Sequence, residues 1–301
     1  MDLAKLIRRF RVERPDQFTL IDCDPADTGG LDIDKTAAKA MIGEGTKKLS
    51  RLQETLYADG HWAVLVILQG MDTAGKDGVI EHVLSGVNPQ GCEVHAFKPP
   101  NADELDHDFL WRAAARLPRR GKIGIFNRSY YEECLVVRVH PEFLERQKLP
   151  PQIVTKNIWQ ERFEDIRAFE RHLVRNGTLV LKFHLRISKQ EQARRLLDRL
   201  DDPSKRWKFN KGDIAERELW DQYMAAYEDM IRNTSTSEAA WHVVPADHKW
   251  FARLVTSAAL VDALERLDLK FPSIEGEAPE LKKIRQALAA QVPAGGGDRK
   301  R

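Results

Sequence analysis

An apolar run that breaks into a glycine-bracketed loop and then into a helix constrains this chain more than any other feature. Trp62 to Leu68 is continuously apolar, which is typical of a strand buried on both faces of a parallel sheet. The spacing Gly70-x4-Gly75-Lys76 follows, and it is the spacing of a phosphate-binding loop. The glycines let main-chain N–H groups turn onto phosphate oxygens, while the next helix and the Lys76 ammonium add positive charge. The segment predicts phosphate chemistry, with an ordinary strand–turn–helix corner as the alternative.

Two positions of this loop depart from the usual nucleoside triphosphatase pattern. Asp77 follows the lysine, so the Ser or Thr hydroxyl that commonly holds Mg²⁺ is missing. Asp72 lies inside the loop, where a carboxylate suits phosphates only if it binds a metal ion that bridges to them. We therefore expect Asp72 to hold Mg²⁺, with Mn²⁺ as the alternative ion. The other loop residues expected to contact phosphate are Gly70, Met71, Thr73, Ala74, Gly75 and Asp77.

Charge and cysteine content exclude several classes of protein. The 301 residues carry 48 Lys and Arg against 46 Asp and Glu, a net charge of +2, so the chain is no bulk polycation. Its 3 cysteines are widely spaced, which suggests neither a zinc site nor a disulfide framework. No apolar stretch resembles a signal peptide or a membrane span. We expect a cytoplasmic protein that binds neither nucleic acid nor a membrane.

Apolar runs alternate with helical periodicity along the chain. Strands are predicted at 62–68, 92–97, 123–126, 178–185 and 241–244. Helices are predicted at 35–59, after the loop, and at 105–117, 154–175, 189–200, 212–232 and from the last strand to 267. This alternation indicates an α/β fold, an αβα sandwich around a parallel sheet. We expect an N-terminal arm at 1–34, one domain at 35–271 and a flexible C-terminal tail at 272–301.

Polar residues follow two further predicted strands. Arg128 is placed to fork onto a phosphate, and the neighbouring Asn127 offers a carbonyl oxygen that a magnesium ion could use. An Asn-Arg-Ser turn is also common without any ligand. Lys98, after the strand at 92–97, is a candidate contact to the phosphates of an acceptor, with a solvated strand end as the alternative.

A basic stretch after the fourth predicted strand lies where P-loop kinases carry a lid. We expect this lid at about 189–212, with Arg199 stabilising charge that develops in the transition state. Asp202-Pro203 stiffens the hinge, and Trp207 is expected to anchor the lid. The expected lid residues are Lys205, Arg206, Trp207 and Lys208. A solvated helix end is the alternative for such a charge run.

Three segments, GMDTAGKDG, FNRSYYEECLVVRVH and RLDDPSKRWKF, occur in this order, and the region 35–270 resembles the polyphosphate kinase 2 family. The resemblance implies a thymidylate kinase-like P-loop kinase, a three-layer αβα sandwich with a five-stranded parallel sheet and a helical lid. It also implies a homodimer or homotetramer. The subgroup that it resembles most acts on nucleoside mono- and diphosphates. It implies transfer of the terminal phosphoryl group of inorganic polyphosphate to AMP and ADP, reversible in principle, with guanine nucleotides as further acceptors.

The same resemblance assigns roles to single residues. It implies that Asp72 binds magnesium and that Glu132 carries the carboxylate of the monophosphate-active subgroup; on residue type alone, Glu132 could instead pair with a neighbouring Arg or Lys. Asn127 stands where many members have Asp, which weakens its assignment as a direct metal ligand. The residues expected to be catalytic are Asp72, Lys76, Arg128 and Arg199.

An acceptor phosphate is already anionic and needs no general base, so catalysis rests on charge cancellation and positioning. A polyanionic donor would explain further basic residues, although a basic surface patch is the default interpretation. The candidates for a donor channel are Arg112, Arg116, Arg119, Arg120 and Lys122. Two other functions stay open: an ATP-dependent nucleoside monophosphate kinase on the same fold, and a P-loop regulator without transfer activity. Asp72 together with Arg199 speaks against the regulator.

Overall fold

Five parallel strands form the centre of the molecule, in the order β2-β3-β1-β4-β5. The computed structural model describes residues 3–31, 33, 35–273 and 278–292. The strands are β1 Ala63–Gln69, β2 Cys92–Ala96, β3 Ile123–Asn127, β4 Thr178–Arg186 and β5 Trp241–Pro245. Because β1 lies between β3 and β4, the strand order reverses beside it, and open α/β sheets bind ligands at the carboxyl ends next to such a reversal.

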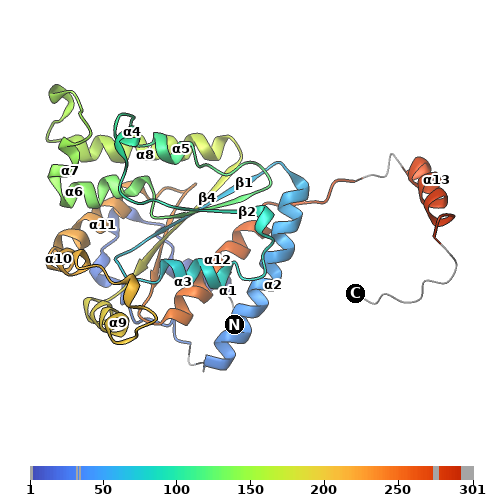
Figure 1. The fold of residues 1–301 in the computed structure, drawn as a ribbon, viewed down its shortest axis with the longest axis horizontal. Coiled ribbons are helices and arrows are strands. Elements are labelled where there is room, and N and C mark those ends of the chain that lie inside the picture. Colours follow the sequence, from blue (N-terminus) through green and yellow to red (C-terminus); the bar gives the residue numbers. More distant parts are fainter. Residues whose placement is uncertain (1–2, 32, 34, 274–277, 293–301) are drawn as a thin grey trace.

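Helices cover both faces of this sheet, which confirms the predicted αβα sandwich (Figure 1). The helices α2 Lys35–Asp59, α3 Lys76–Val83 and α12 Lys249–Glu265 pack on one face, and α8 Ile158–Arg175 and α11 Trp220–Thr234 on the other. Every residue of β1 is buried, which explains its uninterrupted apolar sequence. The shorter helices are α4 Ala102–Leu105, α5 Trp111–Ala114, α6 Val136–Val139, α7 Pro141–Glu145, α9 Lys189–Asp201 and α10 Gly212–Glu218.

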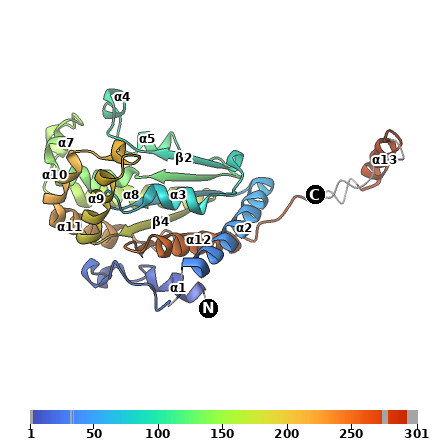
Figure 2. The same cartoon turned by 60° about the horizontal axis from the view of Figure 1, so that its bottom comes forward.

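The N-terminal arm contains a helix, α1 Leu3–Phe10. Leu6, Ile7 and Phe10 are buried, and the Phe10 ring lies 5.5 Å from that of Phe251 on α12. Figure 2 shows α1 lying against α12. Beyond the helix, the main chain of the arm pairs with β5 through an isolated bridge between Arg11 and His242. The arm therefore covers the β5 edge of the sheet, which would otherwise present unpaired main-chain groups.

The prediction of a single helix at 105–117 is wrong. Two short helices, α4 and α5, stand there instead. Asn101 and Glu104 cap α4 reciprocally, and the Asp108 side chain accepts a hydrogen bond from the main-chain N–H of Leu110. Such local bonds from polar side chains compete with continuous helix, which explains the break.

Other boundaries also differ from the prediction. The helix expected from 154 begins at Ile158, because Pro151–Ile153 forms a separate 3₁₀ turn. The helix expected at 212–232 is interrupted at Leu219 and gives α10 and α11. In the predicted tail, Ala278–Ala289 forms helix α13, while 274–277 and 293–301 lie outside the described residues.

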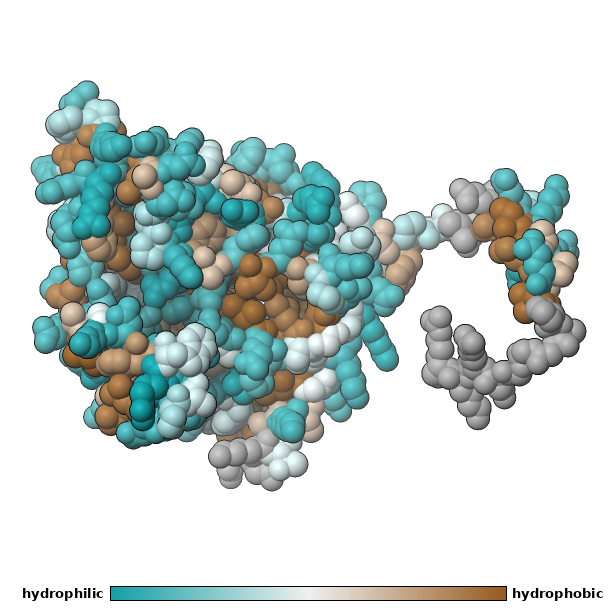
Figure 3. Space-filling model, viewed as in Figure 1, coloured by the Kyte–Doolittle hydropathy of each residue, from teal (hydrophilic) through white to brown (hydrophobic). Residues whose placement is uncertain are grey.

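Within the described residues, no helix combines the length and apolar character needed to cross a membrane. The face seen in Figure 3 is mainly hydrophilic and is interrupted by an apolar patch near its middle.

Candidate active site

The loop between β1 and α3 has the geometry that its glycine spacing predicts. Gly70 and Gly75 have φ of 153° and 108°, and a Cβ at Gly70 would lie 2.8 Å from the Leu185 carbonyl oxygen. Thr73 has φ of 66°, a conformation that a β-branched residue keeps only where its surroundings hold it. The helix α3 begins directly after the loop at Lys76, so the free N–H groups of its first turn face the loop.

Lys76 is buried beneath this loop. Its Nζ donates hydrogen bonds to the carbonyl oxygens of Gly70 at 2.6 Å and Met71 at 3.2 Å. Burial, followed by the charge of Arg128, lowers the pKa of Lys76 to about 8. Since its hydrogen-bond partners are neutral carbonyl groups, an anion bound in the loop would stabilise the charged form.

Arg128, directly after β3, joins two of the predicted carboxylates. Its Nη2 donates to Asp72 Oδ1 at 2.5 Å and its Nη1 to Glu132 Oε2 at 3.1 Å. Attraction to Glu132, and also to Asp72, raises the pKa of Arg128 despite its burial. The structure thus brings together the predicted residues of two distant segments. It also contains the ion pair that the sequence left open as the alternative role of Glu132.

The turn after β3 rests on a buried ion pair. Lys182 Nζ donates to Glu170 Oε2 at 2.6 Å, and the two side chains are 0% and 2% exposed. The hydroxyl groups of Tyr130 and Tyr131 donate to Glu170 Oε1 at 2.8 and 2.7 Å. These bonds fix the residues that follow Arg128 in the turn.

Asp72 presents a carboxylate that could hold a divalent cation at the cavity. Magnesium at phosphoryl-transfer sites usually takes one or two carboxylates and completes its shell with phosphate oxygens and water. Among the residues that the structure describes, no cluster of three or more His, Cys, Asp or Glu could hold a metal ion, and a site of this kind does not need one. Burial, and then the negative charge of Asp72, raises the pKa of Asp213 on α10, so a second carboxylate faces the same region. The donor set fits Mg²⁺.

Asn127 could contribute only its carbonyl oxygen to such a site. Its Nδ2 donates to Asp77 Oδ1 at 2.6 Å, so the amide is oriented by the residue that replaces the usual Ser or Thr.

A cavity of about 910 Å³ lies over these groups, large enough for a nucleotide. Lys98 lines it, and the Lys98 carbonyl oxygen accepts a hydrogen bond from Arg112 at 2.6 Å. The guanidinium of Arg112 in turn lies 5.1 Å from the centre of the Phe97 ring. The predicted site residues that line the cavity are Gly70, Met71, Asp72, Thr73, Ala74, Gly75, Lys76, Asp77, Lys98, Asn127, Arg128, Glu132, Arg199, Lys205 and Lys208.

Comparison with known proteins agrees with this geometry. Residues 32–272 match the family Polyphosphate kinase 2 (PPK2). The chain belongs to the polyphosphate kinase 2 family. An ADP-polyphosphate phosphotransferase of Rhodopseudomonas palustris is 50% identical over 250 residues, 82% of this chain and 86% of the relative. An AMP/ADP-polyphosphate phosphotransferase of Meiothermus ruber is 45% identical over 269 residues, 89% of this chain and 97% of the relative.

A solved structure shows the same fold. The crystal structure of Polyphosphate Kinase 2 from Arthrobacter aurescens matches with a TM-score of 0.86 and 40% sequence identity, covering 97% of this chain and 98% of the other. The predicted P-loop kinase fold is therefore confirmed.

The predicted lid at about 189–212 contains α9 and the 3₁₀ turn Arg206–Lys208, and α10 follows it. Arg199 on α9 approaches Asp213 on α10, with 3.6 Å between Nη1 and Oδ2, so α9 and α10 meet there. The predicted anchoring role of Trp207 is wrong, because its side chain is 78% exposed. A 3₁₀ turn repeats every three residues, so Lys205 and Lys208 share the side that lines the cavity, while Arg206 and Trp207 do not line it.

The prediction that the basic residues before β3 form a channel for the donor is also wrong for most of these residues. Lys122 Nζ pairs with Glu93 Oε1 at 2.6 Å, and Arg120 donates to the His61 carbonyl oxygen at 2.7 Å. These residues precede β3 and so lie at the amino end of the sheet, opposite the loop. Of the five candidates, Arg112 alone lines the cavity.

Other cations that sequence patterns did not indicate line the cavity. Lys249 and Arg253, one turn apart on α12, lie beside the loop. A Cβ added at Gly78 would lie 3.3 Å from Arg253 Nη2, which places this guanidinium next to α3.

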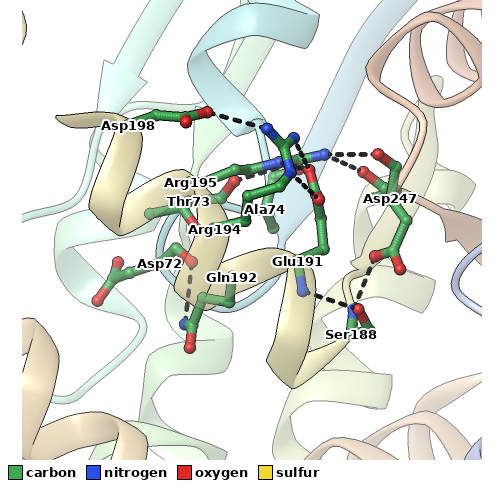
Figure 4. A network of polar contacts seen from close by, with 11 residues as sticks. Asp72, Thr73, Ala74, Ser188, Glu191, Gln192, Arg194, Arg195, Asp198 and Asp247 are labelled. Atoms are coloured by element: carbon green, nitrogen blue, oxygen red, sulfur yellow. Dashed lines mark hydrogen bonds and ion pairs between the residues drawn. The ribbon is translucent and has the colours of Figure 1, made fainter. Parts of the chain in front are cut away.

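Sequence patterns also missed Gln192 and Arg195 on α9, which donate hydrogen bonds to the main chain of the loop (Figure 4). Their spacing to Arg199, i, i+3 and i+7, would have placed all three on one helix face. That spacing was the signal available in the sequence.

Proposed function

We propose that this polyphosphate kinase 2 transfers the terminal phosphoryl group of inorganic polyphosphate to AMP and ADP, giving ADP and ATP. The observation that carries the proposal is the convergence of Lys76, Arg128 and Arg199 on one cavity with Asp72 among them. The names of the relatives from R. palustris and M. ruber, which cite ADP and AMP/ADP as substrates, support it.

Different residues serve different parts of the phosphoryl transfer. Main-chain N–H groups of the loop and the Lys76 ammonium hold the phosphates of the donor. Arg128 and Arg199 surround the moving group and stabilise the charge that spreads over its oxygens. Magnesium held by Asp72 would neutralise charge between donor and acceptor phosphates. The acceptor oxygen is already anionic, so no residue has to remove a proton.

The donor side of the cavity favours polyphosphate over ATP. Lys249 and Arg253 extend the positive surface beyond the loop, and Lys205 and Lys208 face it from the lid. Several cations around one cavity suit a repeating polyanion, whereas ATP requires a place for a purine base. This distribution of charge distinguishes the proposal from an ATP-dependent nucleoside monophosphate kinase.

Glu132 is the residue that we assign to the acceptor side. AMP presents its terminal phosphate one unit closer to the ribose than ADP does, so one site must serve two lengths. The Glu132 carboxylate, next to Arg128, would orient a cation or hydrated metal ion near the α-phosphate of AMP.

The experiment that tests the proposal offers two donors to one acceptor. Purified protein is given AMP and Mg²⁺ with polyphosphate or ATP at equal concentration of transferable phosphoryl groups, and ADP formation is followed by chromatography. We expect polyphosphate to support turnover at least 100-fold faster, about 2.7 kcal/mol in the barrier. Equal rates, or turnover with ATP alone, would establish the ATP-dependent kinase instead.

A homodimer or homotetramer, guanine nucleotides as further acceptors, Mn²⁺ as a replacement ion and a cytoplasmic location stay predictions. Light scattering after size-exclusion chromatography measures the first, and the same assay with GMP and with Mn²⁺ measures the second and third.

A further inference from the structure

Side chains donate hydrogen bonds to five successive carbonyl oxygens of the phosphate-binding loop. Those of Gly70 and Met71 accept from Lys76. The next three are held from α9, the first helix of the lid: Gln192 Nε2 donates to the Asp72 carbonyl oxygen at 3.0 Å, and Arg195 Nη1 donates to those of Thr73 and Ala74 at 2.9 and 3.1 Å (Figure 4). Since each peptide unit has its N–H opposite its C=O, these bonds orient the loop N–H groups as well.

The Arg195 side chain is held in place by hydrogen bonds from all three of its guanidinium nitrogens. Besides its two bonds to the loop, Nη2 donates to the carbonyl oxygens of Ala246 and Asp247 at 2.6 and 3.0 Å, and Nε donates to Glu191 Oε1 at 2.6 Å. All five N–H groups of the guanidinium are therefore used, and the residue is 4% exposed. Its acceptors lie on the loop, on its own helix and after β5, so Arg195 ties α9 to the body of the protein.

Gln192 differs from Arg195 because one of its partners, Arg217, belongs to α10. Its Oε1 accepts from Arg217 Nη1 of α10 at 2.7 Å, and the same nitrogen donates to the Lys189 carbonyl oxygen at 2.9 Å. The Gln192 side chain is 1% exposed, so water does not readily replace either partner. One amide group thus contacts α10 at its oxygen and the main chain of Asp72 at its nitrogen.

We infer that Gln192 is a positioning residue that couples the placement of α10 to the main chain of Asp72. When Arg217 holds the amide oxygen, the amide nitrogen is directed at the Asp72 carbonyl, which fixes the peptide unit that carries the proposed magnesium ligand. When α10 moves away, the amide loses one of its two bonds and its orientation is no longer determined. Placement of α10, which bears Asp213, and proper orientation of Asp72 therefore occur together.

The expected effect of this coupling on turnover rests on the proposed phosphoryl transfer, whereas its expected effect on the loop does not. Its test uses Gln192→Met, which keeps side-chain length and removes both hydrogen bonds, Arg217→Met, and the double variant. Gln192→Glu is the second substitution at this position, since it keeps the acceptor for Arg217 and removes the donor to Asp72. Gln190→Met, on the exposed side of the same helix, is the matched control.

Three quantities are measured: kcat and KM for AMP with polyphosphate, amide hydrogen exchange of the loop peptide 70–77, and the melting temperature. We expect Gln192→Met and Arg217→Met each to lower kcat roughly 10-fold to 100-fold, with the KM for AMP changed less than twofold. Loop exchange should be faster in both, and the double variant should be no worse than the more severe single variant. Gln192→Glu should reproduce the faster exchange, and Gln190→Met should match the wild type.

Losses that multiply in the double variant would overturn the coupling. So would wild-type loop exchange in Arg217→Met, or a fall in melting temperature at Gln192 without a fall in kcat. A wild-type protein that shows no polyphosphate-dependent turnover would contradict the proposed function, while the exchange measurements would still decide whether α10 and the loop are coupled.

Discussion

Arg128 Nη2 and Asp72 Oδ1 lie 2.5 Å apart and join two segments separated by 56 positions in the sequence. The pair forms because β1 and β3 are neighbours in the sheet and their carboxyl ends meet. Arg128 therefore balances the carboxylate that is expected to hold magnesium. Donor phosphates would give the Arg128 guanidinium an alternative anionic partner, so Arg128 could exchange Asp72 for a phosphate when the donor binds.

Asp72→Asn should nearly abolish turnover and leave the fold intact. The amide is almost isosteric and still offers an oxygen to Arg128, but it lacks the charge that binds the metal. We expect kcat to fall about 100-fold or more, on the order of 3 kcal/mol in the barrier. Initial rates across a magnesium titration measure the loss, with Asp268→Asn, an 84% exposed carboxylate, as the control. Near-normal rates at saturating magnesium would remove Asp72 from the metal site.

Polyphosphate binding should take up protons above pH 8. Burial lowers the pKa of Lys76 from 10.5 to about 8, so between these values the unfolded chain binds more protons at this residue than the folded protein. This group alone therefore makes stability rise with pH across that window. A polyanion in the loop favours the charged ammonium and raises its pKa again.

The proton uptake is measured by calorimetric titration with polyphosphate at pH 9 in two buffers of different ionisation enthalpy. The wild type should show an uptake that Lys76→Met lacks. Identical uptake in both proteins would assign it to another group.

Arg199→Ala should lower kcat much more than it raises the KM for AMP. In the structure Arg199 lies 3.6 Å from Asp213 rather than in contact with the loop, so its contribution is expected where charge develops on the transferring group. Steady-state kinetics should show a fall in kcat of about 100-fold or more. A change confined to KM would make Arg199 a binding residue.

Glu132→Asn should suppress phosphorylation of AMP far more than that of ADP. The substitution removes the negative charge beside Arg128 that would attract a cation to the shorter acceptor. The ratio of the rates with AMP and with ADP, measured at saturating polyphosphate, tests this prediction. Equal losses would mean that Glu132 serves only to position Arg128, and the acceptor assignment would then rest on the relatives.

The sheet and the loop could be predicted from sequence because their signals are local. The apolar run of β1 and the glycines at 70 and 75 report burial and backbone geometry directly. The turn at Arg128 was found for the same reason, since it directly follows a strand. The basic segments were harder to interpret, because charge alone does not say at which end of a strand a residue lies. Lys122 therefore looked like a donor contact, although it precedes β3 and pairs with Glu93.

Contacts between distant segments could not be predicted. Arg195 reaches the loop across 122 positions, and nothing near Arg195 in the sequence identifies the Thr73 carbonyl as its partner. The prediction of one helix across 105–117 was wrong because the side chains of Asp108 and Asn101 form local caps, which hydrophobic periodicity does not reveal. Lys249 and Arg253 were missed since their role depends on how α12 packs beside α3.

The central claim is that one site uses polyphosphate to phosphorylate AMP and then ADP. The most direct test is a single time course that starts from AMP, polyphosphate and Mg²⁺, with all three adenine nucleotides measured by chromatography. Parallel reactions contain Asp72→Asn, or ADP without polyphosphate to reveal exchange between two ADP molecules. The account predicts that ADP appears first and ATP follows, that both depend on polyphosphate, and that both vanish in Asp72→Asn. ADP that accumulates without ATP, or ATP that forms equally from ADP alone, would contradict it.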